Sequence, residues 1–259
     1  MKVSVITVCY NAVNDIEKTI ISVLNQIDFE FEYIIIDGAS TDGTIDMINK
    51  YKKSITKVVS EPDNGIYDAM NKGIKLATGD WINFMNAGDT FYNDRVLSNF
   101  FKDVSDKTII AYGDTNYVFS LGVKVRRACN LNMMEQKMCF GHQSTFVKTS
   151  YHKSHLFDTS YKSSGDYKML YDAYFKDQVK FQYIPQIVAN FEAEHGMSTS
   201  NAMLVMREDA RLKGIDKNLC WKIKYFFRMI EYKTKLLIKS FLPKRYLDVR
   251  KKKYFDNFK

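Results

Sequence analysis

The chain has 259 residues, of which 46% are hydrophobic and 26% are charged, a composition typical of a folded soluble protein with one or two domains. It contains no run of 18 apolar residues and no secretory pattern at its start, which argues against a transmembrane helix and a cleaved signal. The net charge of +8 is uneven, because residues 217–259 hold 14 Lys and Arg against 3 Asp and Glu, whereas the rest hold 24 against 27. The body is therefore slightly acidic and the C-terminal tail strongly basic.

The four cysteines are scattered along the chain, at Cys9, Cys129, Cys139 and Cys220. They form no CxxC pair, which favours reduced thiols over a disulfide framework or a zinc site. We therefore expect a cytoplasmic protein.

Strands and helices alternate through the first 90 residues. Apolar, β-branched runs predict strands over residues 2–10, 31–36, 56–60 and 81–85. Apolar residues at helical spacing predict helices over residues 14–25, 45–51 and 66–77. This order predicts a parallel, doubly wound α/β sheet.

Acidic and amide side chains follow these strands, at Asn11, at Asp37 and in the stretch Asn86-Ala87-Gly88-Asp89. The carboxyl ends of parallel strands meet at one edge of a sheet, where ligands of such folds bind. Asp89 beside a glycine suits a divalent cation that carries a phosphate, although the same residues also form ordinary turns. No GxGxxG or GxxxxGK[ST] follows a strand, which argues against a dinucleotide-binding domain and a P-loop.

The second half mixes element types. We expect a helix over residues 94–101, a strand over 109–112, a hairpin over 116–125 with Gly122 near its turn, and a strand at 145–147. Further along we expect a helix that begins near Asp166, a strand over 179–191 that Pro185 places at an edge or kinks, and a helix over 203–213.

Five segments together resemble a family 2 glycosyltransferase with the GT-A fold. They read VSVITVCYN, IIIDGASTDGT, EPDNGIYDAMNKGIKLATGDWINFMNAGD, GHQSTF and SGDYKML, and the resemblance covers residues 2–213. It implies a doubly wound, mostly parallel, Rossmann-like sheet with an acceptor-side α+β half. It also implies inverting transfer of a sugar from a nucleotide donor, assisted by Mn²⁺ or Mg²⁺.

The resemblance also assigns roles to residues on the donor side. Nucleotide-sugar binding falls on Thr7, Tyr10, Asn11, Asp37, Asp68, Asn71, Lys72, Asn86 and Ala87. The metal-binding DxD region falls on the Asn86–Asp89 stretch, where Asn86 and Gly88 replace the two acids and Asp89 is the one clear metal candidate. His195 is the second metal candidate. This departure leaves the coordination and the strength of metal dependence open.

On the acceptor side, His142 and Gln143 are expected to contact phosphate or an acceptor hydroxyl. The transfer requires a general base to take the proton of the attacking hydroxyl. By the resemblance this base is Asp166, with Asp158 in reserve. From pattern alone, His142 can equally cap a strand and Asp166 can be a favourable acid in the first turn of a helix.

The tail, residues 217–259, has helical and amphipathic periodicity with interleaved lysines. Three interpretations compete: packing on the catalytic domain, binding to an anionic membrane surface, and binding of nucleic acid. We favour the membrane, at the inner face of the cell membrane, and expect no nucleic acid. The predicted units are thus a GT-A domain over 1–216, divided into 1–101 and 102–216, and a helical tail.

The sequence therefore predicts a hexosyl- or N-acetylhexosaminyl-transferase that acts on a glycan or lipid-linked acceptor in bacterial surface polysaccharide biosynthesis. One alternative is a non-catalytic membrane-surface or nucleic-acid-binding module with a decayed sugar-nucleotide site. A nucleotidyltransferase is a weaker alternative, because it needs a glycine-rich, arginine-bearing loop after the first strand, which residues 10–13 do not form.

Overall fold

The computed structural model describes residues 1–193, 201–241 and 244–257. A nine-stranded sheet has the order β3-β2-β1-β4-β8-β6-β9-β5, and β7 pairs with β6. The strands are β1 (Lys2–Cys9), β2 (Glu30–Asp37), β3 (Lys57–Ser60), β4 (Trp81–Phe84), β5 (Thr90–Phe91), β6 (Ile110–Phe119), β7 (Gly122–Arg126), β8 (Thr145–Lys148) and β9 (Phe181–Glu192).

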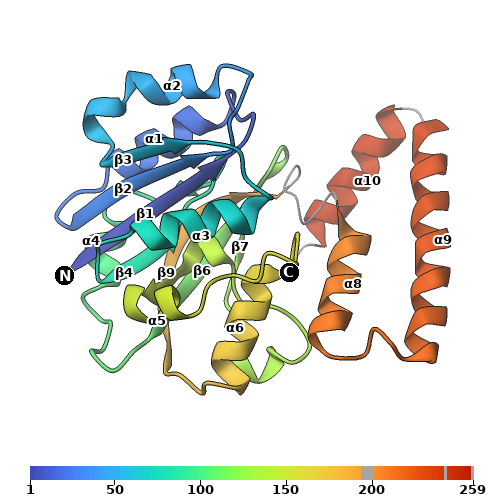
Figure 1. Cartoon of the computed structure of the whole chain (residues 1–259). Helices are drawn as coiled ribbons and strands as arrows, with labels where there is room; N and C mark the ends of the chain where they lie inside the picture. The colour runs from blue at the N-terminus through green and yellow to red at the C-terminus, as the bar shows by residue number, and fades with distance from the viewer. Residues whose placement is uncertain (194–200, 242–243, 258–259) are drawn as a thin grey trace.

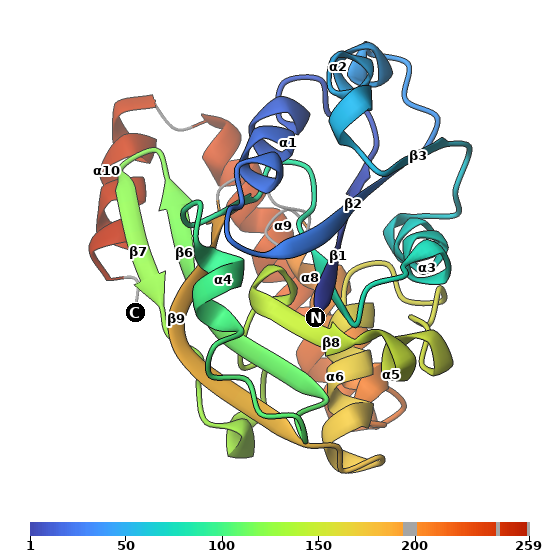
Figure 2. The same cartoon turned by 90° about the vertical axis from the view of Figure 1, so that its left-hand side faces the viewer.

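Helices cover both faces of this sheet (Figures 1 and 2). They are α1 (Ile16–Leu24), α2 (Thr44–Lys50), α3 (Ile66–Leu76), α4 (Val96–Phe100), α5 (Thr149–Ser154), α6 (Gly165–Phe175), α8 (Ala202–Leu212), α9 (Leu219–Phe241) and α10 (Lys244–Asp256). Short 3₁₀ turns lie at η1 (Lys52–Ser54), η2 (Leu131–Met133) and η3 (His142–Ser144).

The first half forms the predicted doubly wound sheet. Strand β1 pairs in parallel with β2 and β4, and β2 pairs in parallel with β3. Alternate residues of β1 enter different cores, because Val3 and Val5 pack with α1 and α4 whereas Ile6 and Val8 pack with α3. Burial on both faces explains why this strand is apolar throughout.

The second half adds antiparallel pairs. Strand β8 lies antiparallel between β4 and β6, and β6 pairs in parallel with β9. The predicted hairpin is confirmed as β6 and β7, with Phe119 opposite Gly122. The β6–β9 pairing is irregular around Pro185. Its register shifts between Tyr183 and Ile187, which is consistent with the predicted kink. Strand β5 pairs with β9 only at Ala189 and Asn190, so around Pro185 the strand pairs with β6 alone and is locally at an edge, as predicted.

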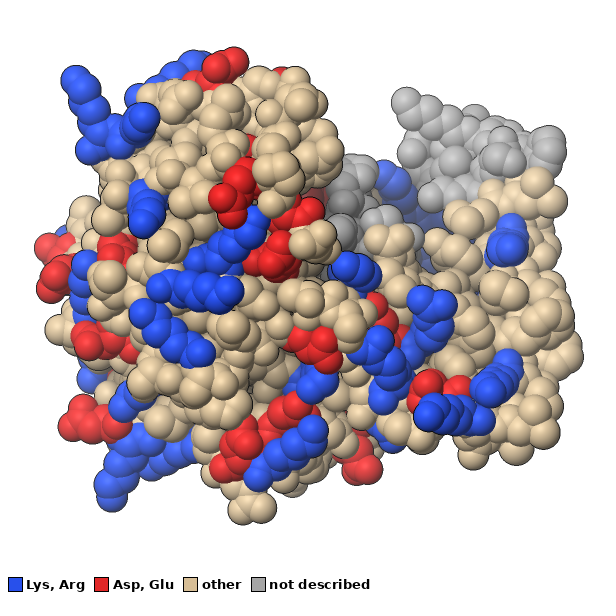
Figure 3. All heavy atoms as spheres, viewed as in Figure 1, with Lys and Arg blue, Asp and Glu red and all other residues tan. Residues whose placement is uncertain are grey.

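The C-terminal helices lie beside the sheet domain (Figure 1). Helix α9 contacts α8, where the Tyr225 hydroxyl donates to the Met203 carbonyl at 3.3 Å. Helix α10 contacts the β6–β7 hairpin, where the rings of Phe255 and Phe119 lie 5.6 Å apart. On the right of Figure 3 the surface over α9 is mostly uncharged, with scattered Lys and Arg. Among the described residues, no helix combines the length and apolarity needed to cross a membrane.

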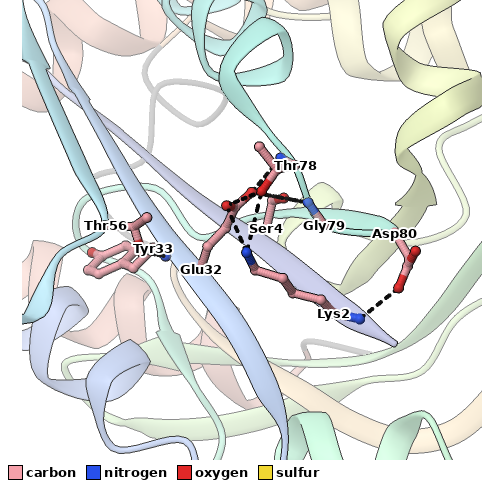
Figure 4. Close-up of polar contacts among 8 residues, drawn as sticks. All are labelled: Lys2, Ser4, Glu32, Tyr33, Thr56, Thr78, Gly79 and Asp80. Atoms are coloured by element: carbon pink, nitrogen blue, oxygen red, sulfur yellow. Dashed lines mark hydrogen bonds and ion pairs between the residues drawn. The ribbon is translucent and has the colours of Figure 1, made fainter.

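A buried carboxylate joins the strands at their amino ends, away from the predicted ligand edge (Figure 4). Glu32 is 4% exposed and accepts from the amides of Thr78 and Gly79, the hydroxyls of Ser4 and Thr78, and the Lys2 ammonium. Burial acts to raise the pKa of Glu32, but these donors outweigh it and lower the pKa to about 2. The contact ties β1 and β2 to the segment between α3 and β4.

Candidate functional site

A cavity of about 480 Å³ opens at the carboxyl ends of the parallel strands. Residues from β1, the start of α3, the segment after β4, the turn η3 and the start of α6 line it. Its polar lining includes Tyr10, Asp63, Asn86, Asp89, His142, Ser163, Asp166 and Glu192. The structure therefore brings together residues that the sequence separates by more than 150 positions, at the predicted edge of the sheet.

The turn after β4 places Asn86 and Asp89 in this cavity. Gly88 has φ of +102°, a conformation that favours glycine. The Thr19 hydroxyl of α1 accepts from the Gly88 amide at 3.0 Å and donates to the Asp89 carbonyl at 2.7 Å. The turn is thus anchored to α1.

His142 lies opposite this turn because β8 pairs with β4. The Asn83 amide of β4 donates to the carbonyls of Gln143 and Thr145, at 3.1 and 3.0 Å, and so fixes η3. The His142 ring then bridges two site residues, with Nε2 3.0 Å from the Asn86 amide nitrogen and Nδ1 3.1 Å from Asp166 Oδ2.

Asp166 in the first turn of α6 accepts three hydrogen bonds. His142 reaches Oδ2, while the Tyr67 hydroxyl and the Tyr167 amide reach Oδ1 at 3.0 and 2.9 Å. A carboxylate can accept about four hydrogen bonds, so one acceptor position on Oδ2 remains for a ligand. Burial acts to raise the pKa of Asp166, but the hydrogen bond and charge of His142, with the other donors, outweigh it and lower the pKa. Asp166 is therefore ionised and can accept a proton.

The pKa of His142 is raised, whereas that of Asp166 is lowered. Burial acts to lower the pKa of His142, but the hydrogen bond to Asp166 and the charges of Asp166 and Asp89 raise it above its usual range. The Oδ1 atom of Asn86 is buried and has no hydrogen-bond partner among the described residues. This atom and the buried Ser163 hydroxyl are polar groups at the cavity that no residue in the described part of the chain satisfies.

Asp89 is the acid best placed to hold a cation. Burial raises its pKa to about 7, although the charge of His142 and a backbone hydrogen bond from Glu192 oppose that rise. A nearby cation would favour the ionised form of such a carboxylate. Glu192 lines the same cavity, so two carboxylates and the Asn86 amide oxygen fit a hard cation such as Mn²⁺ or Mg²⁺. Among the described residues there is no group of three acids, histidines or cysteines in metal-binding arrangement, and His195 lies outside them.

Several predicted donor-side residues hold loops rather than line the cavity. Asp37 is fully buried, and accepts from the Ser40 amide at 3.0 Å and the Ser60 hydroxyl at 2.6 Å. The Thr7 hydroxyl donates to the Met85 carbonyl at 2.7 Å. The Asn11 side chain accepts from the Thr41 amide at 2.9 Å. Direct contacts of these three side chains with a nucleotide stay predictions.

The polar residues of α3 likewise point away from the cavity, which Ile66, Tyr67, Ala69 and Met70 line. Asp68 accepts from the Asn64 amide at 3.0 Å, and Lys72 donates to the Pro62 carbonyl at 2.7 Å. Both amide atoms of Asn71 bond to the backbone of Phe157 at 2.9 Å. The contacts of Asp68 and Lys72 shape the loop that carries Asp63. Asp158 and Gln143 also lie outside the lining.

Several lining residues have no predicted role, among them Tyr67, Asp63 and Glu192. Tyr67 lies on the apolar face of α3, which the helical periodicity could have identified. Asp63 packs over Gly38, where an added Cβ would lie 2.5 Å from its Oδ2 and 3.3 Å from the ring of Tyr10. A side chain at position 38 would therefore meet both the Asp63 carboxylate and the Tyr10 ring, which is 65% exposed.

The sequence profile of "Glycosyl transferase family 2" matches residues 4–161. The chain belongs to this family. It is a glycosyltransferase, as the site and the match together indicate. The PGL/p-HBAD biosynthesis glycosyltransferase of Mycobacterium bovis is 27% identical over 190 residues, which are 69% of this chain and 72% of that protein. The putative teichuronic acid biosynthesis glycosyltransferase TuaG of Bacillus subtilis is 40% identical over 97 residues, 36% of this chain and 38% of TuaG.

Solved structures share the fold. Residues 1–349 of S. aureus TarS, in complex with UDP-GlcNAc, have a TM-score of 0.64 and 20% identity, and the match covers 82% of this chain and 66% of that fragment. The mannosyltransferase PcManGT of Pyrobaculum calidifontis, in complex with GDP-Man and Mn²⁺, has a TM-score of 0.62 and 19% identity, with 81% of this chain and 62% of PcManGT covered. The chain spans about two thirds of the TarS 1–349 fragment and 39% of the longer TarS chain, and these matches confirm the predicted GT-A fold.

Proposed function

We propose that this glycosyltransferase moves a hexosyl or N-acetylhexosaminyl group, with inversion, from a nucleoside-diphosphate sugar to a glycan or lipid-linked acceptor. The observation that carries the proposal is the ionised, buried Asp166, which has one free acceptor position beside the cavity that Asn86 and Asp89 line. The names of the mycobacterial and Bacillus relatives support a role in bacterial surface glycan biosynthesis.

The donor would bind on the side of β1 and α3. The exposed Tyr10 ring offers an apolar face on which a nucleobase can stack, and Asp63 beside it can accept hydrogen bonds from the base or ribose. Asn86 and Ala87 would then contact the sugar or the diphosphate. Asp89 and Glu192 would hold Mn²⁺ or Mg²⁺, which supplies Lewis-acid stabilisation of the leaving diphosphate when bound.

In the transfer, an acceptor hydroxyl oxygen forms a bond to the anomeric carbon while the bond from that carbon to the diphosphate oxygen breaks. The hydroxyl proton passes to Oδ2 of Asp166. His142, Tyr67 and the Tyr167 amide hold this carboxylate in place and ionised before the acceptor arrives.

A panel of nucleotide sugars tests the proposal, with release of UDP, GDP or other nucleotides measured in Mn²⁺, Mg²⁺ or chelator. We expect release from one donor class, increased by metal and by acceptor. If no donor reacts and calorimetry detects no nucleotide binding at millimolar concentration, the chain is instead a module with a decayed site.

We also propose that the tail binds an anionic membrane surface at the inner face of the cell membrane. Helix α9 packs on α8 through one face and leaves a second face in solvent. On the second face, five large apolar side chains at helical spacing are 46–71% exposed: Leu219, Ile223, Phe226, Phe227 and Ile230. Successive residues of an α-helix are rotated by about 100° around its axis. This rotation places Lys222 and Lys233 along one side of the apolar stripe and Lys224 along the other. Apolar burial flanked by lysines is the pattern of a helix that lies in a headgroup layer.

Sedimentation with phosphatidylglycerol vesicles tests the membrane proposal. The double variant Phe226→Ser/Phe227→Ser should bind at least about tenfold more weakly, because each buried Phe contributes about 1.5–3 kcal/mol. Tyr92→Ser, which removes an exposed ring outside the tail, should bind like the wild type. Equal sedimentation of all three proteins would contradict the proposal, and a dimer that only the double variant loses would assign this face to a second copy of the chain.

A further inference from the structure

Glu208 on α8 points at the loop that precedes α6. Its side chain is 4% exposed and accepts hydrogen bonds from three successive backbone amides. Oε1 accepts from Lys162 at 2.7 Å, and Oε2 accepts from Ser163 and Ser164, each at 2.9 Å. The three amides belong to residues that directly precede α6, which begins at Gly165 and carries Asp166 in its first turn.

Other contacts fix the same loop from the remaining sides. The Lys162 ammonium donates to the Asn64 carbonyl at 2.9 Å, which joins the loop to the segment that carries Asp63. One turn of α8 beyond Glu208, the Arg211 guanidinium lies 3.9 Å from the centre of the Tyr161 ring. At Gly165, an added Cβ would lie 2.8 Å from the Tyr67 ring. The start of α6 therefore packs closely against Tyr67, whose hydroxyl donates to Asp166.

We infer that Glu208 is a positioning residue for the general base, an inference that rests on the proposed role of Asp166. The Glu208 carboxylate can accept hydrogen bonds from all three amides at once. A Gln side chain there would turn its NH₂ group, which is a donor, towards at least one of these N–H groups and lose that bond. The three charge-assisted bonds fix the backbone immediately before Asp166, and thereby its distance from Tyr67 and His142. Glu208 and the loop both lie beyond residues 4–161 that the family profile matches.

The test compares Glu208→Gln with Glu135→Gln, the same change at an exposed side chain. We expect kcat to fall about 10- to 100-fold in Glu208→Gln, because small displacements of a catalytic group have effects of this size. The Kd for the nucleoside diphosphate should stay within about twofold in both variants, since Glu208 does not hold the donor side. The acid limb of the pH–rate profile should move to higher pH only in Glu208→Gln, because the donors that lower the pKa of Asp166 are weakened.

Further measurements separate positioning from plain loss of structure. Nucleotide-binding stoichiometry gives the folded fraction, and amide exchange of residues 160–170 should quicken in Glu208→Gln alone. If Glu208→Gln does not fold, Glu208→Asp replaces it, with the same split expected between kcat and Kd. Unchanged kcat and pH profile, or a fall in kcat matched by the binding stoichiometry, would overturn the inference. If the wild type transfers no sugar, the proposed function fails; if it transfers and Glu208→Gln equals it, this inference alone fails.

Discussion

The two ends of the central strands carry buried carboxylates in opposite states. At the amino ends, Glu32 has five hydrogen bonds from protein donors and a pKa lowered to about 2 (Figure 4). At the carboxyl ends, Asp89 has its pKa raised to about 7 by burial, and the nearby Asn86 Oδ1 and Ser163 hydroxyl have no partner among the described residues. The carboxylate of the first cluster is fully paired, whereas among the described residues the donors and charges around Asp89 do not offset its burial, and a bound cation could do so.

This difference separates a structural site from a functional one by physical criteria. Buried polar groups are nearly always paired within a protein, and exceptions with perturbed pKa values gather where ligands bind. Substitutions at the two ends should therefore have different effects. Those at the carboxyl ends should impair ligand binding and transfer with little loss of stability. Those at the amino ends should lower stability with little effect on ligand binding and transfer.

The largest effect that sharpens this contrast is expected at Asp89. Asp89→Ala should lower Mn²⁺ affinity and metal-dependent transfer by about 10²-fold or more, because it removes the buried acid that is best placed to hold the cation. In the wild type, Mn²⁺ must displace a proton below pH 7, so its affinity should rise about tenfold per pH unit up to about pH 7 and then level off. Electron paramagnetic resonance of Mn²⁺ across pH 5.5 to 8.5 measures both effects.

A pH-independent Mn²⁺ affinity, or full affinity in Asp89→Ala, would place the cation elsewhere. Asp46→Ala provides the control, since that acid lies in α2 and does not line the cavity.

An intermediate effect is expected at His142. His142→Asn should lower kcat/KM about 10- to 100-fold, because Asp166 loses a hydrogen bond and a neighbouring charge. The same loss raises the pKa of Asp166, so the acid limb of the pH profile should move to higher pH. An unchanged limb in the pH–rate profile of His142→Asn would show that His142 does not set the ionisation of Asp166. His155→Asn changes an exposed histidine instead and should leave the profile in place.

The smallest effect on transfer is expected at Glu32. Glu32→Gln should lower the free energy of unfolding by about 1–3 kcal/mol, since several buried donors lose an ionised acceptor. The folded pKa is lower than the unfolded one, so the stabilisation is present above about pH 4.5 and is lost as the pH falls towards 2. Urea unfolding at pH 7 and pH 3 should therefore show a larger deficit at pH 7, with nucleotide affinity unchanged. A deficit of equal size at both pH values would contradict this account.

Much of the first half of the molecule could be predicted from the sequence. Apolar runs such as residues 2–10 can be satisfied only by burial on both faces, and the alternation with helices then fixes a parallel sheet. The place of Asp89 at the edge of that sheet followed from the same pattern. Asp166 and His142 were predicted by family resemblance, and the structure places both in the cavity.

The contacts within loops could not be predicted. Asn71 lies on the same helix as Tyr67, but only the tertiary structure brings Phe157 to its amide and Asp166 to the tyrosine hydroxyl. Asp37 ends β2 and Asp63 follows β3, but Asp37 bonds to Ser40 and Ser60 whereas Asp63 lines the cavity. Glu208 gives no local signal at all, because its three partners are about 45 residues away in the sequence.

The most direct test of the central claim compares transfer by the wild type and Asp166→Asn at saturating donor, with the donor Kd measured in parallel. We predict that Asp166→Asn binds the nucleotide sugar normally but transfers about 10²- to 10⁴-fold more slowly, because Asn cannot accept the hydroxyl proton. Transfer by Asp166→Asn at the wild-type rate would show that the proton goes to another group, and the assignment of the general base would be wrong.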